Sequence, residues 1–106
     1  MAQQFVNSKI KSDKVTVFGK PACPYCRMAL ELLSKYPFKD EHLEFIDITS
    51  RSDMESIQKY FQQATGARTV PRVYIGETCI GGYTELEALH KKGELSPRLQ
   101  QIGALQ

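Results

Sequence analysis

Apolar side chains in the first half of the chain switch between the spacing of strands and that of helices. Residues 14–19 and 43–48 are rich in β-branched and aromatic side chains, which favour strands. Between them, residues 24–36 carry apolar side chains at positions i, i+3, i+4 and i+7, which predicts a helix with one buried face. That face is expected to hold Cys26, Ala29, Leu30 and Leu33. A short helix over 2–11 is predicted on the same grounds.

Two helices in the second half begin with the capping-box pattern, in which Ser or Thr is followed three residues later by Glu. The two pairs are Ser52 with Glu55 and Thr84 with Glu87. Gly66 and Gly93 are expected to end these helices, because glycine adopts the left-handed conformation of a helix end without strain. A last helix is predicted over 95–102.

Between these helices, residues 72–75 and 78–80 predict a hairpin with a two-residue turn at Gly76-Glu77. The first two strands of the chain are separated by a helix, so they should be parallel and joined by a right-handed crossover. The hairpin then adds antiparallel strands. The expected fold class is therefore α/β: a single domain over residues 1–106, with a four-stranded mixed sheet and helices on both faces.

Composition and charge argue against some classes of function. A net charge of +2 is too small to indicate nucleic acid or a membrane surface as a partner. No run of about 18 apolar residues is present to span a bilayer, and the N-terminal residues lack signal or transit character. We therefore expect a cytoplasmic protein. Its three cysteines are an odd number, whereas a secreted domain held together by disulfides usually has an even number. In the reducing cytosol, a Cys-x-x-Cys pair is more often catalytic or metal-binding than structural.

The Cys23-Pro24-Tyr25-Cys26 motif carries the chemistry. It follows the first predicted strand, and Pro24 suits the first turn of a helix, where no amide hydrogen bond is lost. Cys23 would then stand at the helix start, where unpaired N–H groups and the helix dipole favour a thiolate, while Cys26 faces the interior. Because the thiolate is the attacking form, the motif predicts thiol–disulfide exchange with Cys23 attacking and Cys26 resolving.

The motif alone leaves other roles for the cysteines open. The pair could be inert and structural, or half of a zinc site. Zinc usually takes four ligands, and the chain has only Cys79, His42 and His90 left to offer, with no second pair at finger spacing. Cys79 is expected to be a buried strand residue, although its place near two glycines leaves oxidation-driven regulation or dimerisation open.

Three motifs, in order, resemble one family. Cys-Pro-Tyr-Cys at 23–26 follows a strand, Thr69-Val70-Pro71 precedes the hairpin, and Cys79-Ile80-Gly81-Gly82 comes at its end. With these motifs the chain resembles a dithiol glutaredoxin (thioltransferase) of the cytosolic animal type over essentially all of residues 1–106. The resemblance implies a thioredoxin fold. It also implies an enzyme that uses glutathione to reduce protein–glutathione mixed disulfides and protein disulfides.

The resemblance further implies a glutathione groove beside the cysteines. A cis peptide bond between Val70 and Pro71 would turn the Val70 N–H and C=O toward a docked thiol peptide, which could pair with them like an added strand. Tyr25 would form one wall of this groove, and Thr69 would contact the substrate.

The two ends of glutathione are assigned to different parts of the groove. The residues implied for the glycine carboxylate are Lys20, Gln58 and Arg68. Those implied for the γ-glutamyl end are the backbone N–H groups of Gly82, Tyr83 and Thr84. A helix begins there, and helix starts bind anions. Family members commonly carry an aspartate at the next position, where Glu85 is expected to reach the substrate amine with a longer side chain.

By the same resemblance, glutathione is both reductant and substrate, and no tightly bound cofactor or metal is expected. The protein partners would be glutathionylated or disulfide-containing proteins, with glutathione reductase acting indirectly through the glutathione pool. We expect a monomer. Lys20 and, to a lesser extent, Arg27 would support the Cys23 thiolate.

Two rival functions share parts of this pattern. A thioredoxin-type enzyme fed by a flavoprotein reductase is disfavoured, because Trp is absent and the dipeptide between the cysteines is Pro-Tyr rather than Gly-Pro. The other is an iron–sulfur carrier, in which two protomers and two glutathiones hold a cluster. Pro24 disfavours it, since carriers in the family usually have one active-site cysteine or a small residue before the aromatic.

Overall fold

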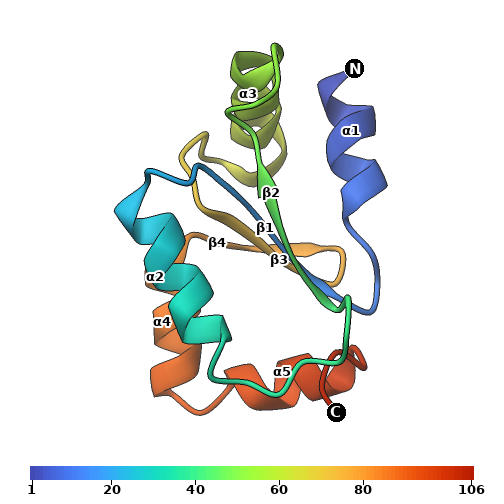
Figure 1. Ribbon diagram of the computed structural model, residues 1–106, viewed down its shortest axis with the longest axis vertical. Helices are drawn as coiled ribbons and strands as arrows, with labels where there is room; N and C mark the ends of the chain where they lie inside the picture. Colours follow the sequence, from blue (N-terminus) through green and yellow to red (C-terminus); the bar gives the residue numbers. More distant parts are fainter.

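The computed structural model describes all 106 residues. In chain order its elements are α1 (Ala2–Lys9), β1 (Val15–Gly19), α2 (Pro24–Leu33), β2 (Leu43–Asp47), α3 (Met54–Thr65), β3 (Arg72–Ile75), β4 (Thr78–Gly81), α4 (Tyr83–Lys91) and α5 (Leu95–Gln101) (Figure 1). This is the predicted order. The strands lie in the order β2-β1-β3-β4, with β1 parallel to β2 and the other neighbours antiparallel. The expected mixed sheet is confirmed.

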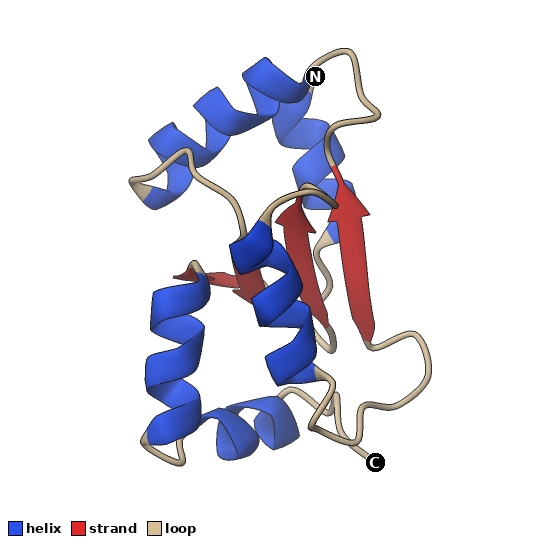
Figure 2. Ribbon diagram, turned by 60° about the vertical axis from the view of Figure 1, so that its left-hand side comes forward, coloured by secondary structure: helices blue, strands red, loops and turns tan.

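Each face of the sheet packs against its own helices, as predicted (Figures 1 and 2). Helices α2, α4 and α5 cover one face, and α1 and α3 cover the other. Because successive side chains of a strand point to opposite faces, Val17 of β1 packs in the core under α2, α4 and α5, and Phe18 packs in the core under α1 and α3. There the Phe18 ring lies 5.3 Å from that of Phe61 and 5.8 Å from that of Tyr74, between centroids.

Helix α2 differs from its prediction in two ways. It ends at Leu33 rather than at residue 36, because the N–H groups of residues 35–36 donate to carbonyls three residues back and Pro37 disfavours a helical residue before it. Its buried side chains are those of Cys26, Ala29, Leu32 and Leu33. Leu30 is only half-buried. Leu32 is buried instead, because α2 packs against α4 as well as against the sheet.

Glycines mark two of the predicted turns. Gly66 ends α3 with a φ of 87°, and Gly76 opens the hairpin turn with a φ of 63°, both in the left-handed region where glycine is unstrained. Helix α1 is shorter than predicted. It ends at Lys9 because Ile10 is already extended, with φ −85° and ψ 137°.

The capping box predicted at the start of α3 is wrong. The helix begins at Met54 with Asp53, not Ser52, as its N-cap residue, and no side-chain hydrogen bond caps it. Instead, Arg51 donates to the two Asp53 carboxylate oxygens at 2.8 and 3.1 Å. A bidentate Arg–carboxylate pair is a strong, directional contact, so it holds the acid away from the helix N–H groups.

The box predicted at the start of α4 is also wrong, by two residues. The helix begins at Tyr83 with Gly82 as N-cap, and Glu85 Oε1 accepts from the Gly82 N–H at 2.6 Å. Thr84 therefore lies inside the first turn. Glu87 accepts instead from the Tyr83 hydroxyl at 3.0 Å.

This assignment predicts which side chain stabilises α4. We expect Glu85→Ala to lower the free energy of unfolding by about 1 kcal/mol, the usual size of a helix-cap contribution. Thr84→Ala removes no capping contact and should change it by less than about 0.5 kcal/mol. Urea unfolding followed by circular dichroism measures both. A larger loss for Thr84→Ala than for Glu85→Ala would contradict the assignment.

Candidate active site

The end of β1 and the start of α2 present the two cysteines of the motif. Cys23 is the N-cap residue of α2 and Pro24 its first helical residue, as predicted. The Cys26 N–H, which has no acceptor within the helix, donates to Cys23 Sγ at 3.3 Å. Cys23 is half-buried, and both cysteines are free thiols. A main-chain N–H and the positive end of the α2 dipole thus meet at the Cys23 sulfur, an arrangement that stabilises negative charge there.

Cys26 has the opposite environment. Its side chain is 1% exposed. Burial, with a smaller contribution from the hydrogen bond to Cys23, raises the pKa of the Cys26 thiol to about 12. Gly19 at the end of β1 makes room for it, because a Cβ there would lie 2.8 Å from Cys26 Sγ and 2.9 Å from a ring carbon of Phe45. Cys26 is therefore a protonated thiol packed beneath Cys23.

The loop before β3 lies beside the start of α2 (Figure 1), where Cys23 stands. Its Val70–Pro71 peptide bond is cis, as the resemblance implied. The Cys23 thiol makes a long contact of 3.9 Å with the Val70 carbonyl oxygen. Gln58 of α3 supports the same loop, since its Nε2 donates to the Arg68 carbonyl at 3.1 Å.

These segments and the start of α4 form a groove of about 410 Å³. Most of the residues predicted to bind glutathione line it, namely Tyr25, Thr69, Val70, Pro71, Gly82, Tyr83, Thr84 and Glu85. The rings of Tyr25 and Tyr83 stand 6.0 Å apart between centroids and form part of its wall. Three predicted residues are not among the lining ones: Lys20, Gln58 and Arg68.

The residues at the start of α4 that line the groove have main-chain donors to offer. The N–H groups of Tyr83 and Thr84, the first two helical residues, have no intrahelical acceptor. Gly82 differs from expectation, because its N–H already donates to Glu85. The Glu85 carboxylate, predicted to reach a substrate amine, caps the helix instead. Gly81 permits this contact, since a Cβ there would lie 2.5 Å from Glu85 Oε1.

Arg72 is a lining residue that sequence reasoning missed. It opens β3 and is only 7% exposed, although charged side chains are rarely buried without a partner. Its Nη1 donates to Thr65 Oγ1 at 3.3 Å, while Nε has no hydrogen-bond partner. The available signal was a charged residue directly after Pro71, at the head of an apolar strand.

The other candidate ligands and thiols lie apart from the motif. Cys79 is half-buried rather than buried, and packs at the margin of the core under α1 and α3. His90 Nδ1 is hydrogen-bonded to the Tyr36 hydroxyl at 2.6 Å, and His42 Nδ1 to the Asp40 carbonyl at 2.7 Å. No three His, Cys, Asp or Glu side chains gather where they could hold one metal ion.

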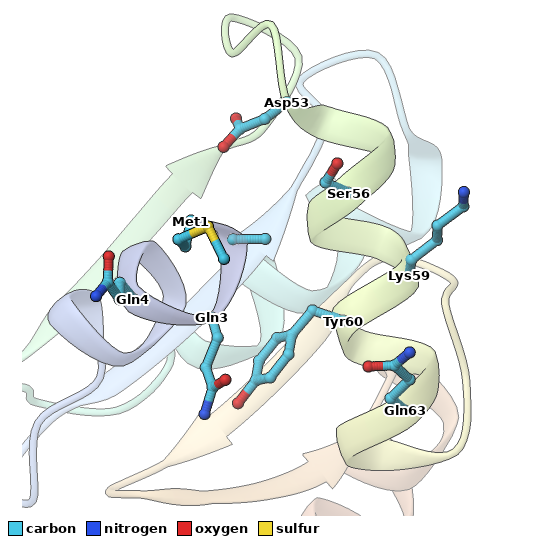
Figure 3. A pocket seen from close by; sticks show the side chains of 9 residues that line it. Met1, Gln3, Gln4, Asp53, Ser56, Lys59, Tyr60 and Gln63 are labelled. Atoms are coloured by element: carbon cyan, nitrogen blue, oxygen red, sulfur yellow. The ribbon is translucent and has the colours of Figure 1, made fainter.

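A larger groove, of about 600 Å³, lies between α1 and α3 (Figure 3). Gln3 and Tyr60 face one another across it, and Asp53 stands at one end. Neither a cysteine nor any residue predicted to bind glutathione lines it. The groove of about 410 Å³, which Tyr25 of the motif lines, is the one that holds residues predicted to bind glutathione. None of the helices has the length and apolar composition that crossing a bilayer requires.

Comparison with known proteins identifies the family. The sequence model of the family Glutaredoxin matches residues 15–80, which include both motif cysteines and the cis Pro71. The chain belongs to the glutaredoxin family. Glutaredoxin-1 of Sus scrofa is 67% identical over 105 residues, 99% of each chain. Glutaredoxin-1 of Homo sapiens is 60% identical over 106 residues, 100% of each chain.

Solved structures agree. The buckwheat glutaredoxin–glutathione complex matches this glutaredoxin with a TM-score of 0.91 at 34% identity, covering 100% of this chain and 94% of the other. Wheat glutaredoxin matches with a TM-score of 0.88 at 33% identity, covering 99% and 96%. The predicted thioredoxin fold is confirmed. So is the predicted activity: this dithiol glutaredoxin is a glutathione-dependent thiol–disulfide oxidoreductase.

The close approach of Gly19 to Cys26 is testable. Gly19→Ala should lower the free energy of unfolding by about 1–3 kcal/mol, because the added methyl overlaps the Cys26 sulfur. In a Cys26→Ala background the loss should be smaller, since the sulfur is gone. Denaturant unfolding of the four proteins of this double-mutant cycle measures the coupling. A cycle additive to within about 0.3 kcal/mol would show that the two residues do not crowd one another.

Proposed function

We propose that Cys23 is the nucleophile of this glutaredoxin and Cys26 its resolving thiol. The observation that carries the assignment is the asymmetry between them: Cys23 Sγ lies 3.3 Å from a main-chain N–H at a helix start, and Cys26 is 1% exposed. The thiolate attacks and the thiol does not, so the sulfur in the anion-stabilising environment reacts first. The charge of Lys20 is proposed to support the Cys23 thiolate. At Cys26, a hydrogen bond with the Lys20 main chain and, to a smaller extent, the Lys20 charge lower the pKa of the thiol, but burial outweighs both.

In the main reaction, Cys23 attacks the glutathione sulfur of a glutathionylated protein. A new S–S bond joins Cys23 to glutathione, while the old one breaks and releases the protein thiolate, which takes a proton from water. A second glutathione thiolate then attacks the bound glutathione sulfur, forming glutathione disulfide and returning Cys23 as a thiolate. A stabilised thiolate is also a good leaving group, so the same environment helps the second step.

Protein disulfides require a second route through Cys26. Cys23 attacks one target sulfur and forms a mixed disulfide. Cys26 then gives up its proton and attacks Cys23, which releases the target as a dithiol and closes the Cys23–Cys26 disulfide. Two glutathiones reduce that bond. With a pKa of about 12, Cys26 does not compete with Cys23 for the first attack.

The groove is the proposed glutathione site. An extended thiol peptide that pairs with the main chain of Val70 would bring its sulfur to Cys23, whose own sulfur is 3.9 Å from the Val70 carbonyl. Tyr25 and Thr69 flank the peptide, beside Pro71. The buckwheat structure, a glutaredoxin–glutathione complex of the same fold, supports glutathione as the ligand.

The charges of glutathione meet two sets of groups. The γ-glutamyl end lies at the start of α4, where the groups are the N–H donors of Gly82, Tyr83 and Thr84 together with the Glu85 carboxylate. For Gly82 and Glu85 to contact the ligand, their mutual hydrogen bond must open. The groups proposed for the glycine carboxylate are Lys20, Gln58 and Arg68. Gln58 also holds the Arg68 carbonyl and so positions that loop.

The cellular setting is part of the proposal. Residues 1–106 form a single glutaredoxin domain that works as a monomer in the cytoplasm, without a tightly bound cofactor. It draws electrons from glutathione and, through the glutathione pool, from glutathione reductase. Its substrates are glutathionylated and disulfide-containing proteins, and it engages neither nucleic acid nor membrane.

Replacing each cysteine in turn tests the mechanism. Cys23→Ser should reduce turnover of a glutathionylated peptide to the uncatalysed rate, because no other thiol lies at the helix start. Cys26→Ser should retain this activity and lose reduction of protein disulfides. Both are measured with glutathione, glutathione reductase and NADPH, and circular dichroism confirms folding. Loss of deglutathionylation in folded Cys26→Ser would contradict the one-thiol route.

A further inference from the structure

The buried guanidinium of Arg72 has no acidic partner. Arg72 is 7% exposed, and the ion pairs of the structure do not include it. Its only side-chain hydrogen bond is a long one of 3.3 Å to Thr65 Oγ1, and that hydroxyl also contacts the Phe61 carbonyl at 2.7 Å. Nε is buried without any partner. Arginine keeps its charge in proteins, so a desolvated positive charge with open donors remains.

This charge lies against the groove. Arg72 lines it together with Gly82, and a Cβ built on Gly82 would lie 3.3 Å from Arg72 Nη2 and 3.1 Å from the Pro71 carbonyl oxygen. Gly82 has φ −111° and ψ −153°, an extended conformation open to any residue. A side chain here would be crowded against both neighbours, and its absence leaves the guanidinium close to the main chain at the start of α4.

The groove has little negative charge to balance Arg72. Glu85 is the one acidic residue that lines it, and its carboxylate is hydrogen-bonded to the Gly82 N–H rather than to the guanidinium. An anion beside Gly82 would meet the buried cation from one side. From the other it would meet the free N–H groups of Tyr83 and Thr84 at the first turn of α4. A carboxylate fits both, because its two oxygens accept from several donors at once.

We propose that Arg72 determines specificity for glutathione by holding the α-carboxylate of its γ-glutamyl residue. This inference rests on the proposed placement of glutathione in the groove. It adds a charged side chain to a subsite otherwise made of main-chain N–H groups, and it predicts discrimination against thiols that lack this carboxylate. The contact of Arg72 with Thr65 places the guanidinium near the C-terminal end of α3, where the helix dipole makes a buried cation more tolerable.

Binding of two ligands that differ at one group tests the proposal. The first ligand is S-methylglutathione, which cannot react with Cys23. The second is an analogue of it in which a carboxamide replaces the γ-glutamyl α-carboxylate. Calorimetric titration of Arg72→Gln should show affinity for S-methylglutathione about tenfold or more below wild type, the size of one charge-assisted hydrogen bond. The carboxamide should bind wild type and Arg72→Gln equally.

Two variants control for charge and folding. Lys92→Gln removes one positive charge from the exposed end of α4, outside this groove, and should leave both affinities unchanged. Arg72→Lys keeps the charge without the planar fork, so it should lose part of the affinity for the carboxylate only. If Arg72→Gln fails to fold, Arg72→Lys alone makes the comparison.

Equal weakening of both ligands would mean that Arg72 acts through the fold, and it would overturn the proposal. Unchanged affinity for S-methylglutathione would overturn it as well. Binding by the wild-type protein distinguishes failure of this proposal from failure of the proposed function. If the wild type does not bind S-methylglutathione, the proposed glutathione groove is refuted. If the wild type and Arg72→Gln bind it equally well, only the role of Arg72 is refuted.

Discussion

One contact organises this protein: the Cys26 N–H donates to Cys23 Sγ across the first turn of α2. It forms because Pro24 starts the helix directly after Cys23, which leaves Cys23 as the N-cap residue. The same turn directs Cys26 inward, into the space that Gly19 leaves open. Two thiols three positions apart thereby acquire opposite environments, one at main-chain N–H donors and one desolvated. The proposed division of labour between nucleophile and resolving thiol follows from that difference.

The topology of the sheet assembles the remaining groups around this contact. Because β3 runs antiparallel to β1, the end of β1, where the motif begins, lies beside the start of β3, where the cis Val70–Pro71 bond stands. Strand β4 follows next to β3, and its end leads into the start of α4. The same antiparallel pairing places Arg72 opposite Phe18 in register. The groove is thus a product of strand order, while the two hydrophobic cores hold each face of the sheet.

Much of this architecture could be predicted from local patterns, because each helix and strand shows its own apolar periodicity and each motif lies within a few residues. The positions of Cys23 and Cys26 follow from Pro24 in this way. The N-caps of α3 and α4 could not be predicted, since Ser52 loses its role to an Arg51–Asp53 pair and Glu85 reaches back to Gly82. The burial of Arg72 also depends on distant segments. A charged residue after a proline appears solvated until the end of α3 and the start of α4 pack against it.

Alkylation at neutral pH tests the central difference between the two thiols. Iodoacetamide labelling of the reduced Cys79→Ser protein at pH 7, read by mass spectrometry, gives the rate at each cysteine. Cys23 should be labelled, whereas Cys26, which is 1% exposed and has a pKa of about 12, should stay unlabelled over the same time. Comparable labelling of the two thiols, or faster labelling of Cys26, would contradict the account.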